Sequence, residues 1–214
     1  PENLVYKAAE LFLGECGLDG GVKLTLTKNI PAGSGLGGGS SDAAATLLGL
    51  NRYFKPNLSR KELAKPAARL GSDVAFFLGG STALCTGRGE KIEELREKFH
   101  FLALLMLPNI SVATEKVYAN YAHDKELFDG FSRAIKGYIA ENRIDLAARM
   151  CANMLEISCF GLESGLAELK TQVEALAAAK CCLSGSGSAM FCILDDADMG
   201  KALGFCTKIH AETG

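Results

Sequence analysis

A glycine-rich stretch between residues 31 and 42 carries the groups best suited to chemistry. It reads Pro-Ala-Gly-Ser-Gly-Leu-Gly-Gly-Gly-Ser-Ser-Asp. Glycine lets backbone N–H groups approach an anion closely and permits positive φ angles. A helix is predicted directly after the glycines, and the free N–H groups and dipole at a helix start favour phosphate. Because Ser40 and Ser41 add hydroxyls that can bond phosphate oxygens or reach Mg²⁺, the stretch predicts a phosphate site.

Three kinds of segment share this composition. The first is a plain flexible loop whose serines cap the following helix. The second is a dinucleotide fold, because Gly33, Gly35 and Gly38 satisfy G-x-G-x-x-G. That fold requires a second parallel strand after the helix, whereas here Lys55-Pro56-Asn57 and another predicted helix follow. The third is an ATP-phosphate loop that is not of the Walker A type, since no G-K-[ST] follows the glycines, and this interpretation is favoured.

A second chemical group lies in residues 71–77, which read Gly-Ser-Asp-Val-Ala-Phe-Phe. A kinase that acts on a hydroxyl needs a carboxylate within hydrogen-bond reach to take the proton or orient the nucleophile. Asp73 is the candidate. The alternative is that Asp73 only caps the turn or helix that follows, a role that Asp often fills. The residues alone leave both interpretations open.

The elements that must position these groups follow from hydrophobic periodicity. Ser40, Ser41 and Asp42 are expected to cap one helix, and Ser59 with Glu62 forms a capping box for the next. Pro66 is expected to kink or break that second helix. Helices are predicted at about 3–13, 43–54, 59–71, 113–122, 125–140, 144–155, 162–179 and 197–209, and strands at 22–26, 81–85, 101–107, 181–183 and 189–194. Because helices and strands intermix without strict alternation, the predicted class is α+β.

Composition excludes several functions. Apolar residues make up 48% of the 214, which allows a sizeable core, and the formal net charge of -2 without a basic cluster excludes a nucleic-acid partner. The longest apolar run, 101–107, is too short to span a bilayer, so a membrane is not indicated. The first residues, Pro1, Glu2 and Asn3, are neither basic nor followed by the apolar run of a signal peptide, so no secretory leader is indicated either. The 8 cysteines stand in apolar contexts without any C-x-x-C pair. They therefore predict free thiols in a reducing cytoplasm and no metal site.

Residues 31–42 resemble the second motif of the GHMP small-molecule kinases. Their sequence is similar to that of the family branch that phosphorylates the 2-hydroxyl of a cytidine diphosphate conjugate of methylerythritol, in non-mevalonate isoprenoid synthesis. Residues 71–77, 108–118 and 184–187 resemble further motifs of the family in the same order, although Ala75 stands where the family usually has proline. The resemblance implies a two-domain fold: an ATP-binding domain at 1–98, S5 domain 2-like and incomplete at its start, and a ferredoxin-like α/β sandwich at 99–214.

The resemblance also implies roles for individual residues, with ATP and Mg²⁺ as cofactors and a small molecule as substrate. Asp73 is the expected base. Tyr118 is expected to stack on the cytosine, and its alternative is an ordinary core aromatic. The nucleotide contacts implied are Asn3, Lys28, Pro31, Gly33, Gly35, Leu36, Gly37, Gly38, Gly39, Ser40, Ser41 and Asp42, and the substrate contacts are Thr114, Tyr118, Ser184, Gly185, Ser186 and Gly187. Helix caps at Asn3 and Asp42, and a solvated strand end at Lys28, are the alternatives there.

The family begins with a segment that is not found in this sequence. That segment carries an A-K-[IVL]-N-L motif whose lysine partners the catalytic aspartate, and no such string is present among the 214 residues. We therefore expect a fragment, or an N-terminal piece that is absent, and a chain of little activity by itself. Two other functions stay open: a different GHMP kinase, such as homoserine or mevalonate kinase, or a nucleotide-binding protein without catalysis. Nothing in the sequence indicates an oligomeric state.

Overall fold

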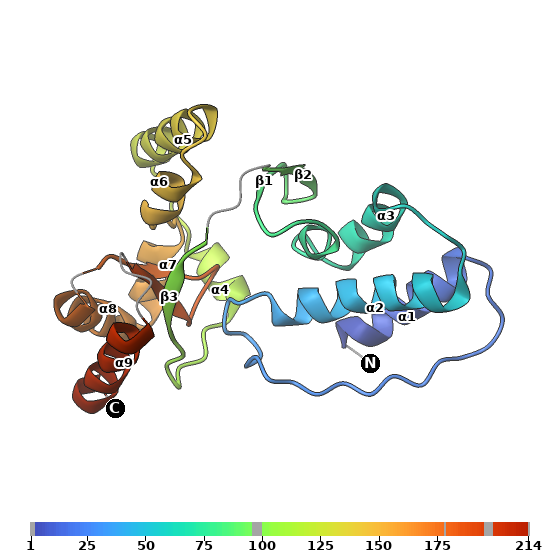
Figure 1. Cartoon of the computed structure of the whole chain (residues 1–214), viewed down its shortest axis with the longest axis horizontal. Coiled ribbons are helices and arrows are strands. Elements are labelled where there is room, and N and C mark those ends of the chain that lie inside the picture. The colour runs from blue at the N-terminus through green and yellow to red at the C-terminus, as the bar shows by residue number, and fades with distance from the viewer. Residues whose placement is uncertain (1–2, 96–99, 178, 195–198, 214) are drawn as a thin grey trace. The chain divides into compact units, whose positions relative to one another are not determined.

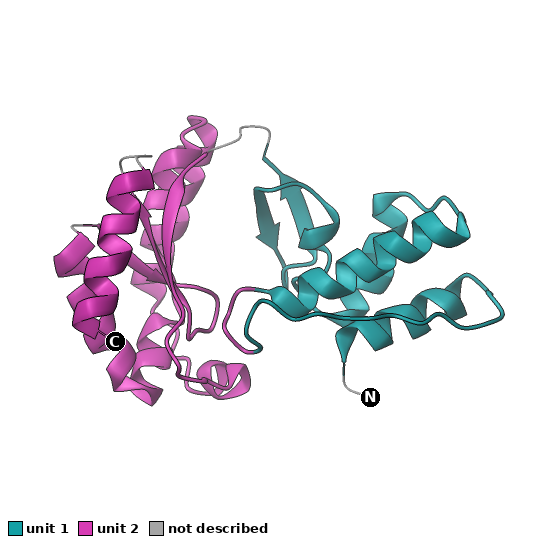
Figure 2. Ribbon diagram, turned by 60° about the horizontal axis from the view of Figure 1, so that its bottom comes forward, with its two compact units in different colours: residues 1–32, 37–98 teal, residues 33–36, 99–214 magenta. Residues whose placement is uncertain are grey.

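The chain forms two compact units that mix helices with small antiparallel sheets (Figures 1 and 2). The computed structural model describes residues 3–95, 100–177, 179–194 and 199–213. The first unit comprises residues 1–32 and 37–98, and the second comprises residues 33–36 and 99–214. This arrangement confirms the predicted α+β class. The predicted domain boundary, between residues 98 and 99, lies outside the described residues.

The first unit is built on three helices, α1 (Leu4–Glu15), α2 (Gly38–Phe54) and α3 (Arg60–Leu70). α1 and α2 run side by side, and the alanines on their facing sides let the helices approach closely (Figure 1). Phe12 and Leu47 fill the core between these helices and are almost completely buried. A short 3-10 helix, η1 (Phe76–Leu78), and a hairpin of β1 (Ala83–Thr86) and β2 (Lys91–Glu94) complete the unit.

The helix boundaries of this unit confirm some predictions and correct others. Ser59 and Glu62 form the predicted capping box of α3. The helix then continues through Pro66 without the predicted break, because Leu63, Pro66 and Ala67 are buried against the core and packing outweighs the lost backbone bond. α2 begins earlier than predicted, at Gly38, with Gly37 as its N-cap residue. Ser40, Ser41 and Asp42 therefore lie inside the helix and do not cap it.

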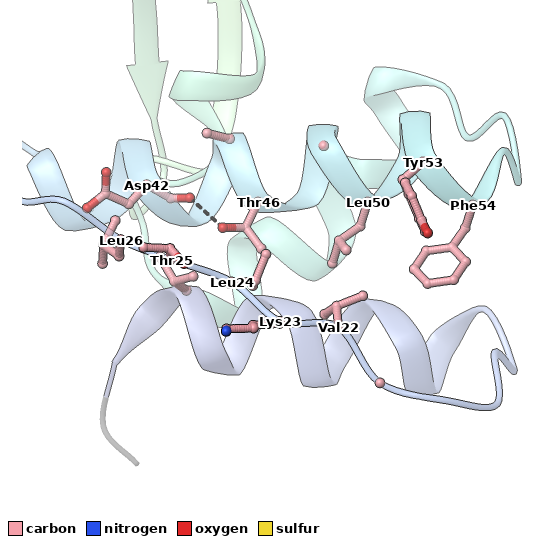
Figure 3. Close-up of a pocket in the computed structure, with 14 residues that line it drawn as sticks. Val22, Lys23, Leu24, Thr25, Leu26, Asp42, Thr46, Leu50, Tyr53 and Phe54 are labelled. Carbon is pink, nitrogen blue, oxygen red and sulfur yellow. Dashed lines mark hydrogen bonds between the residues drawn. The ribbon is translucent and has the colours of Figure 1, made fainter.

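The strand predicted at residues 22–26 is wrong. These residues form no ladder with any described strand, and they cross α1 and α2 as extended chain (Figure 3). The alternation of Val22, Leu24 and Leu26 with polar residues correctly indicated an extended backbone. Alternation cannot supply a neighbour, however, and a strand exists only where another strand receives its hydrogen bonds.

The second unit contains a three-stranded antiparallel sheet in the order β3 (Leu102–Met106), β5 (Met190–Leu194), β4 (Cys181–Leu183). Leu104 and Cys181 both lie opposite Cys192 in the register. Leu104, Cys192 and Cys181 face the buried core of this unit. The sheet shares that core with α4 (Thr114–Ala119), α7 (Glu156–Leu162), α8 (Ser164–Ala177) and α9 (Met199–Thr213).

Two more helices, α5 (Lys125–Ala140) and α6 (Ile144–Arg149), stand between α4 and α7 in the chain. α5 has its predicted bounds, and Asp124 caps it by accepting a hydrogen bond from Leu127 N–H. The helix predicted at 144–155 is wrong beyond Arg149. Cys151 there has a positive φ of 48°, which a helix cannot contain, and α7 was not predicted as a separate element.

Candidate active site

The start of α2 presents backbone N–H groups without a side-chain partner. Gly37, the N-cap residue, has a left-handed φ of 67°, and no side chain of a described residue caps the helix. A Cβ atom on Gly37 would lie 2.8 Å from Cζ of Phe77, and one on Gly38 would lie 3.1 Å from Cγ2 of Ile30. Glycine is thus required here for conformation and for space. The result is an uncovered helix N-terminus, which is an arrangement that binds phosphate.

The preceding part of the glycine-rich loop, residues 33–36, belongs to the second unit and lies against the Ser184–Gly187 turn. The Ser184 hydroxyl donates to the Gly35 carbonyl at 3.0 Å, and Ala189 N–H donates to the Ser34 carbonyl at 3.0 Å. A Cβ atom on Gly35 would collide with the Ser184 carbonyl oxygen. The loop and the turn, 149 residues apart in the sequence, are therefore in direct backbone contact.

The Ser184–Gly187 turn also reaches α4. Ser186 is buried, and its hydroxyl lies 2.8 Å from the Thr114 hydroxyl, at the first residue of α4. Tyr118, one turn further along this helix, exposes 61% of its surface, while its neighbour Val117 is fully buried. The structure thus brings together Thr114 and Ser186. It also makes Tyr118 an accessible ring and rules out its being an ordinary core aromatic.

Asp73 lies in the turn that precedes η1, and its side chain is exposed. Among the described residues, its carboxylate has no hydrogen bond and no ion pair, and the N-cap residue of η1 is Ala75. Since no described backbone N–H donates to its carboxylate, Asp73 is not a capping residue. Burial, and secondarily the nearby Asp73 charge, raise the pKa of the Cys85 thiol. Asp73 is thus a carboxylate of the first unit without a partner among the described residues, and Phe77, four residues later, packs against Gly37.

Lys28, Asp42 and Asn3 have partners in the first unit. Lys28 Nζ lies 2.7 Å from Asp42 Oδ2, with side chains 46% and 27% exposed. Lys28 is thus a paired residue. Asn3 does cap α1, because its Oδ1 accepts from Val5 N–H at 2.9 Å. This outcome matches the capping alternative for Asn3 and contradicts it for Asp42.

A cavity of 640 Å³ lies in the first unit between residues 21–26 and one face of α2 (Figure 3). Asp42 is at one end of this face and Tyr53 is near the other, with Thr46 and Leu50 between them. The Thr46 hydroxyl donates to the Asp42 carbonyl at 2.8 Å. The volume is in the range of sites for small organic ligands. Of the predicted site residues, Asp42 is the one that lines this cavity.

Four further predicted residues have no side-chain hydrogen bond. In the loop, Pro31 and Gly33 are exposed and Leu36 is half-buried, and in the first turn of α2 Gly39 is half-buried. Within the described ranges, no group of three or more His, Cys, Asp or Glu side chains is placed to hold a metal ion. All eight cysteines are free. No described helix is long and apolar enough to cross a bilayer.

Asn153, which lies between α6 and α7, was not among the predicted site residues. Its Nδ2 donates to the carbonyls of Leu183 and Gly185, both at 2.8 Å, and its Oδ1 accepts from Leu155 N–H at 2.9 Å. A signal was present, because Asn153-Met154-Leu155-Glu156 has the spacing of a capping box. The helix predicted across 144–155 concealed this signal.

The fold defines the class of the protein. Residues 3–87 match the family described as GHMP kinases N terminal domain. Homoserine kinase from Cytophaga hutchinsonii superposes with a TM-score of 0.80, covering 98% of this chain and 71% of that one. At 22% identity this likeness shows the fold alone. The chain is thus built as a GHMP kinase, as the resemblance predicted.

Two further comparisons identify the family within that class. The chain is 36% identical over 214 residues to 4-diphosphocytidyl-2-C-methyl-D-erythritol kinase of Bacillus pumilus, covering 98% of this chain and 74% of that protein. A crystal structure of 4-(cytidine 5'-diphospho)-2C-methyl-D-erythritol kinase superposes with a TM-score of 0.70 at 32% identity, covering 98% and 75% of the two chains. The chain belongs to the 4-diphosphocytidyl-2-C-methyl-D-erythritol kinase family.

Proposed function

We propose that this protein transfers the γ-phosphoryl group of ATP to the 2-hydroxyl of 4-diphosphocytidyl-2-C-methyl-D-erythritol, a step of non-mevalonate isoprenoid synthesis. The observation that carries the proposal is the start of α2. No side chain of a described residue caps its N–H groups, and a side chain at Gly37 or Gly38 would meet Phe77 or Ile30. Family membership supports the choice of acceptor. The alternative acceptor, homoserine, is supported by the likeness in fold to a homoserine kinase alone.

The residues of the loop suit a triphosphate. The N–H groups of the first turn of α2 would bind phosphate oxygens, and the Ser40 and Ser41 hydroxyls add polar contacts beside them. Mg²⁺ needs few protein ligands, because it keeps several waters and binds substrate phosphates. One serine hydroxyl of this pair would suffice to hold it. The Lys28–Asp42 pair and the adjoining cavity are our candidates for the adenosine end.

Asp73 is the proposed base. A carboxylate that forms no hydrogen bond or ion pair with any described residue is free to accept the proton of a substrate hydroxyl, or to orient that hydroxyl. Thr114, Ser186 and the exposed ring of Tyr118 are proposed to bind the cytidyl substrate, with the ring stacking on the base. Such stacking contributes about 1–3 kcal/mol per base. Catalysis is then mainly positioning and electrostatic stabilisation.

The test uses the protein expressed from its complete reading frame, with MgATP and a panel of alcohols that includes the cytidyl substrate and homoserine. We expect phosphorylation of the cytidyl substrate, detected by phosphorus NMR and mass spectrometry. Asp73→Asn is expected to lower kcat by at least about 10²-fold, the usual scale for a positioned acid–base group. ATP affinity and melting temperature should change little, since no described residue loses a hydrogen bond.

Asp19→Asn is the matched control, because Asp19 is also exposed in the first unit and makes the same change of charge. Turnover of homoserine in preference to the cytidyl substrate would overturn the proposed acceptor. Equal turnover by the two Asp→Asn variants would overturn the role of Asp73. A protein that binds ATP analogues and phosphorylates no alcohol would be a nucleotide-binding protein instead.

A further inference from the structure

The amide nitrogen of the Asn153 side chain binds the backbone around the Ser184–Gly187 turn. Both protons of Nδ2 are donated to carbonyls that flank Ser184, those of Leu183 and Gly185, at 2.8 Å each. Its Oδ1 is fixed in turn by Leu155 N–H at the start of α7. The side chain therefore cannot rotate without losing three bonds, and it connects α7 to the turn.

The turn depends on an external constraint of this kind. Gly185 and Gly187 have φ angles of 55° and 91°, where glycine has many other conformations available. Among the described residues, Gly187 N–H donates to the Ser184 carbonyl within the turn, and Ser184 N–H donates to the Ala189 carbonyl at its base, both at 2.9 Å. Without the Asn153 amide, the Gly185 carbonyl would have no donor among the described residues and could reorient, whereas the Leu183 carbonyl stays in β4 and keeps its contact with Cys182 Sγ.

The turn has contacts on two sides that matter for the reaction. The Ser184 hydroxyl donates to the Gly35 carbonyl in the glycine-rich loop at 3.0 Å. The Ser186 hydroxyl lies 2.8 Å from that of Thr114. One contact thus concerns the loop proposed to bind ATP, and the other concerns a residue proposed to bind the acceptor. All of these residues belong to the second unit.

We propose that Asn153 is a positioning residue for phosphoryl transfer, which fixes the Ser184–Gly187 turn so that the turn supports residues 33–36 of the ATP loop. The proposal rests on the proposed function, because the loop is assigned to ATP there. Asn153 touches no reacting atom. It acts through two backbone carbonyls and the Ser184 hydroxyl, and its loss should alter the loop conformation on which nucleotide affinity depends.

Asn153→Asp is the decisive variant, because it keeps the shape and the Oδ1 acceptor for Leu155 N–H but removes both donors. Asn51→Asp is a closely matched control. Asn51 Nδ2 donates to the Leu58 carbonyl at 2.9 Å, and its Oδ1 accepts from Leu58 N–H at 3.0 Å. It therefore loses the same kind of bond from another half-buried asparagine, which holds the segment after α2 in the first unit. Asn153→Ser, which is neutral and keeps one donor, separates lost donation from added charge.

We expect Asn153→Asp to raise the KM for ATP at least about tenfold while kcat falls less, with Asn51→Asp close to wild type in both. Asn153→Ser should lie between wild type and Asn153→Asp. Amide exchange should accelerate at Ala189, whose N–H donates to the Ser34 carbonyl. A purely structural asparagine would give the opposite split, because a smaller folded fraction lowers kcat and leaves KM unchanged.

The dissociation constant of a non-hydrolysable ATP analogue keeps this test independent of turnover. If the wild-type protein phosphorylates nothing, the proposed function fails, and a tenfold weaker analogue affinity in Asn153→Asp still supports the role of Asn153. If Asn153→Asp does not fold, Asn153→Ser decides. Analogue affinity and KM in Asn153→Ser and Asn153→Asp that match those of Asn51→Asp would overturn the proposal.

Discussion

Gly37 is the residue on which the proposed phosphate site depends most directly. It supplies a left-handed φ of 67° at the N-cap of α2, and its missing side chain leaves the space that the Phe77 ring approaches. A left-handed residue other than glycine costs about 1–2 kcal/mol. Gly33 and Gly35 earlier in the loop also have positive φ angles, of 72° and 78°, so the local backbone geometry favours glycine at these positions too.

Gly37→Ala is expected to weaken the binding of an ATP analogue at least about tenfold, which corresponds to about 1.4 kcal/mol. Its Cβ atom must move Phe77 or tilt the first turn, so that the N–H groups of α2 change direction. Gly14→Ala, in α1 of the same unit and away from the cavity, is the control. A Cβ atom on Gly14 would meet no described atom within 4 Å beyond the backbone of its own helix, and the alanine should stabilise α1 by about 0.5–1 kcal/mol. Calorimetry that found equal analogue affinity in the two variants would contradict the phosphate site.

At the scale of elements, the sequence predicted helix bounds correctly where a helix carries its own capping residues. The bounds of α5 were predicted, and α3 starts at the predicted capping box. Prediction failed where the outcome depends on distant residues. Residues 22–26 alternate like a strand but have no described partner strand. The helix predicted across 144–155 stops at Arg149, since Cys151 has a positive φ of 48° and Asn153 binds the distant carbonyls of Leu183 and Gly185. Periodicity contains no information on either relation.

The α3 capping box makes a pH-dependent contribution to stability. Hydrogen bonds from the Ser59 hydroxyl and backbone hold the pKa of the exposed Glu62 carboxyl below its usual value of 4.5. Because the folded pKa is lowered, this contribution is present above pH 4.5 and is lost as the pH falls through the folded pKa. Ser59→Ala should destabilise the first unit by about 0.5–2 kcal/mol at neutral pH.

Urea unfolding of wild type and Ser59→Ala over a pH series tests this expectation. The difference in unfolding free energy between the two proteins should narrow as the pH falls below 4.5, since protonated Glu62 no longer accepts these bonds well. Ser81→Ala, at an exposed serine outside any helix, serves as the control. A constant difference across the series would show that the hydroxyl acts on the Glu62 N–H alone.

At the scale of the whole molecule, the sequence placed the motifs in order but could not show how the chain divides between the two cores. Residues 33–36 belong to the second unit, although the chain on both sides of them belongs to the first. That assignment results from the contacts of Ser34 and Gly35 with a turn far along the chain. The family motif identified the loop as a single functional segment, whereas the structure divides it between Leu36 and Gly37.

Two separate cores predict two separable responses to destabilisation. Leu47 in α2 and Leu166 in α8 are both fully buried, one in the core of each unit. Replacing either leucine with alanine should lower the free energy of unfolding by about 2–5 kcal/mol, from lost burial and the cavity left behind.

Since stability is distributed over cooperative regions, Leu47→Ala should accelerate amide exchange at Cys16 and Leu63, which donate to carbonyls within the first unit. Leu166→Ala should accelerate it at Ser184 and at Ala189, the residue that binds the Ser34 carbonyl. The informative amide is Ala189, because it reports on the part of the glycine-rich loop that belongs to the second unit. We expect its exchange to follow Leu166→Ala and to be insensitive to Leu47→Ala, although Leu47 is much closer to the loop in sequence. Equal acceleration at all four amides in both variants would mean that the chain unfolds as a single cooperative body.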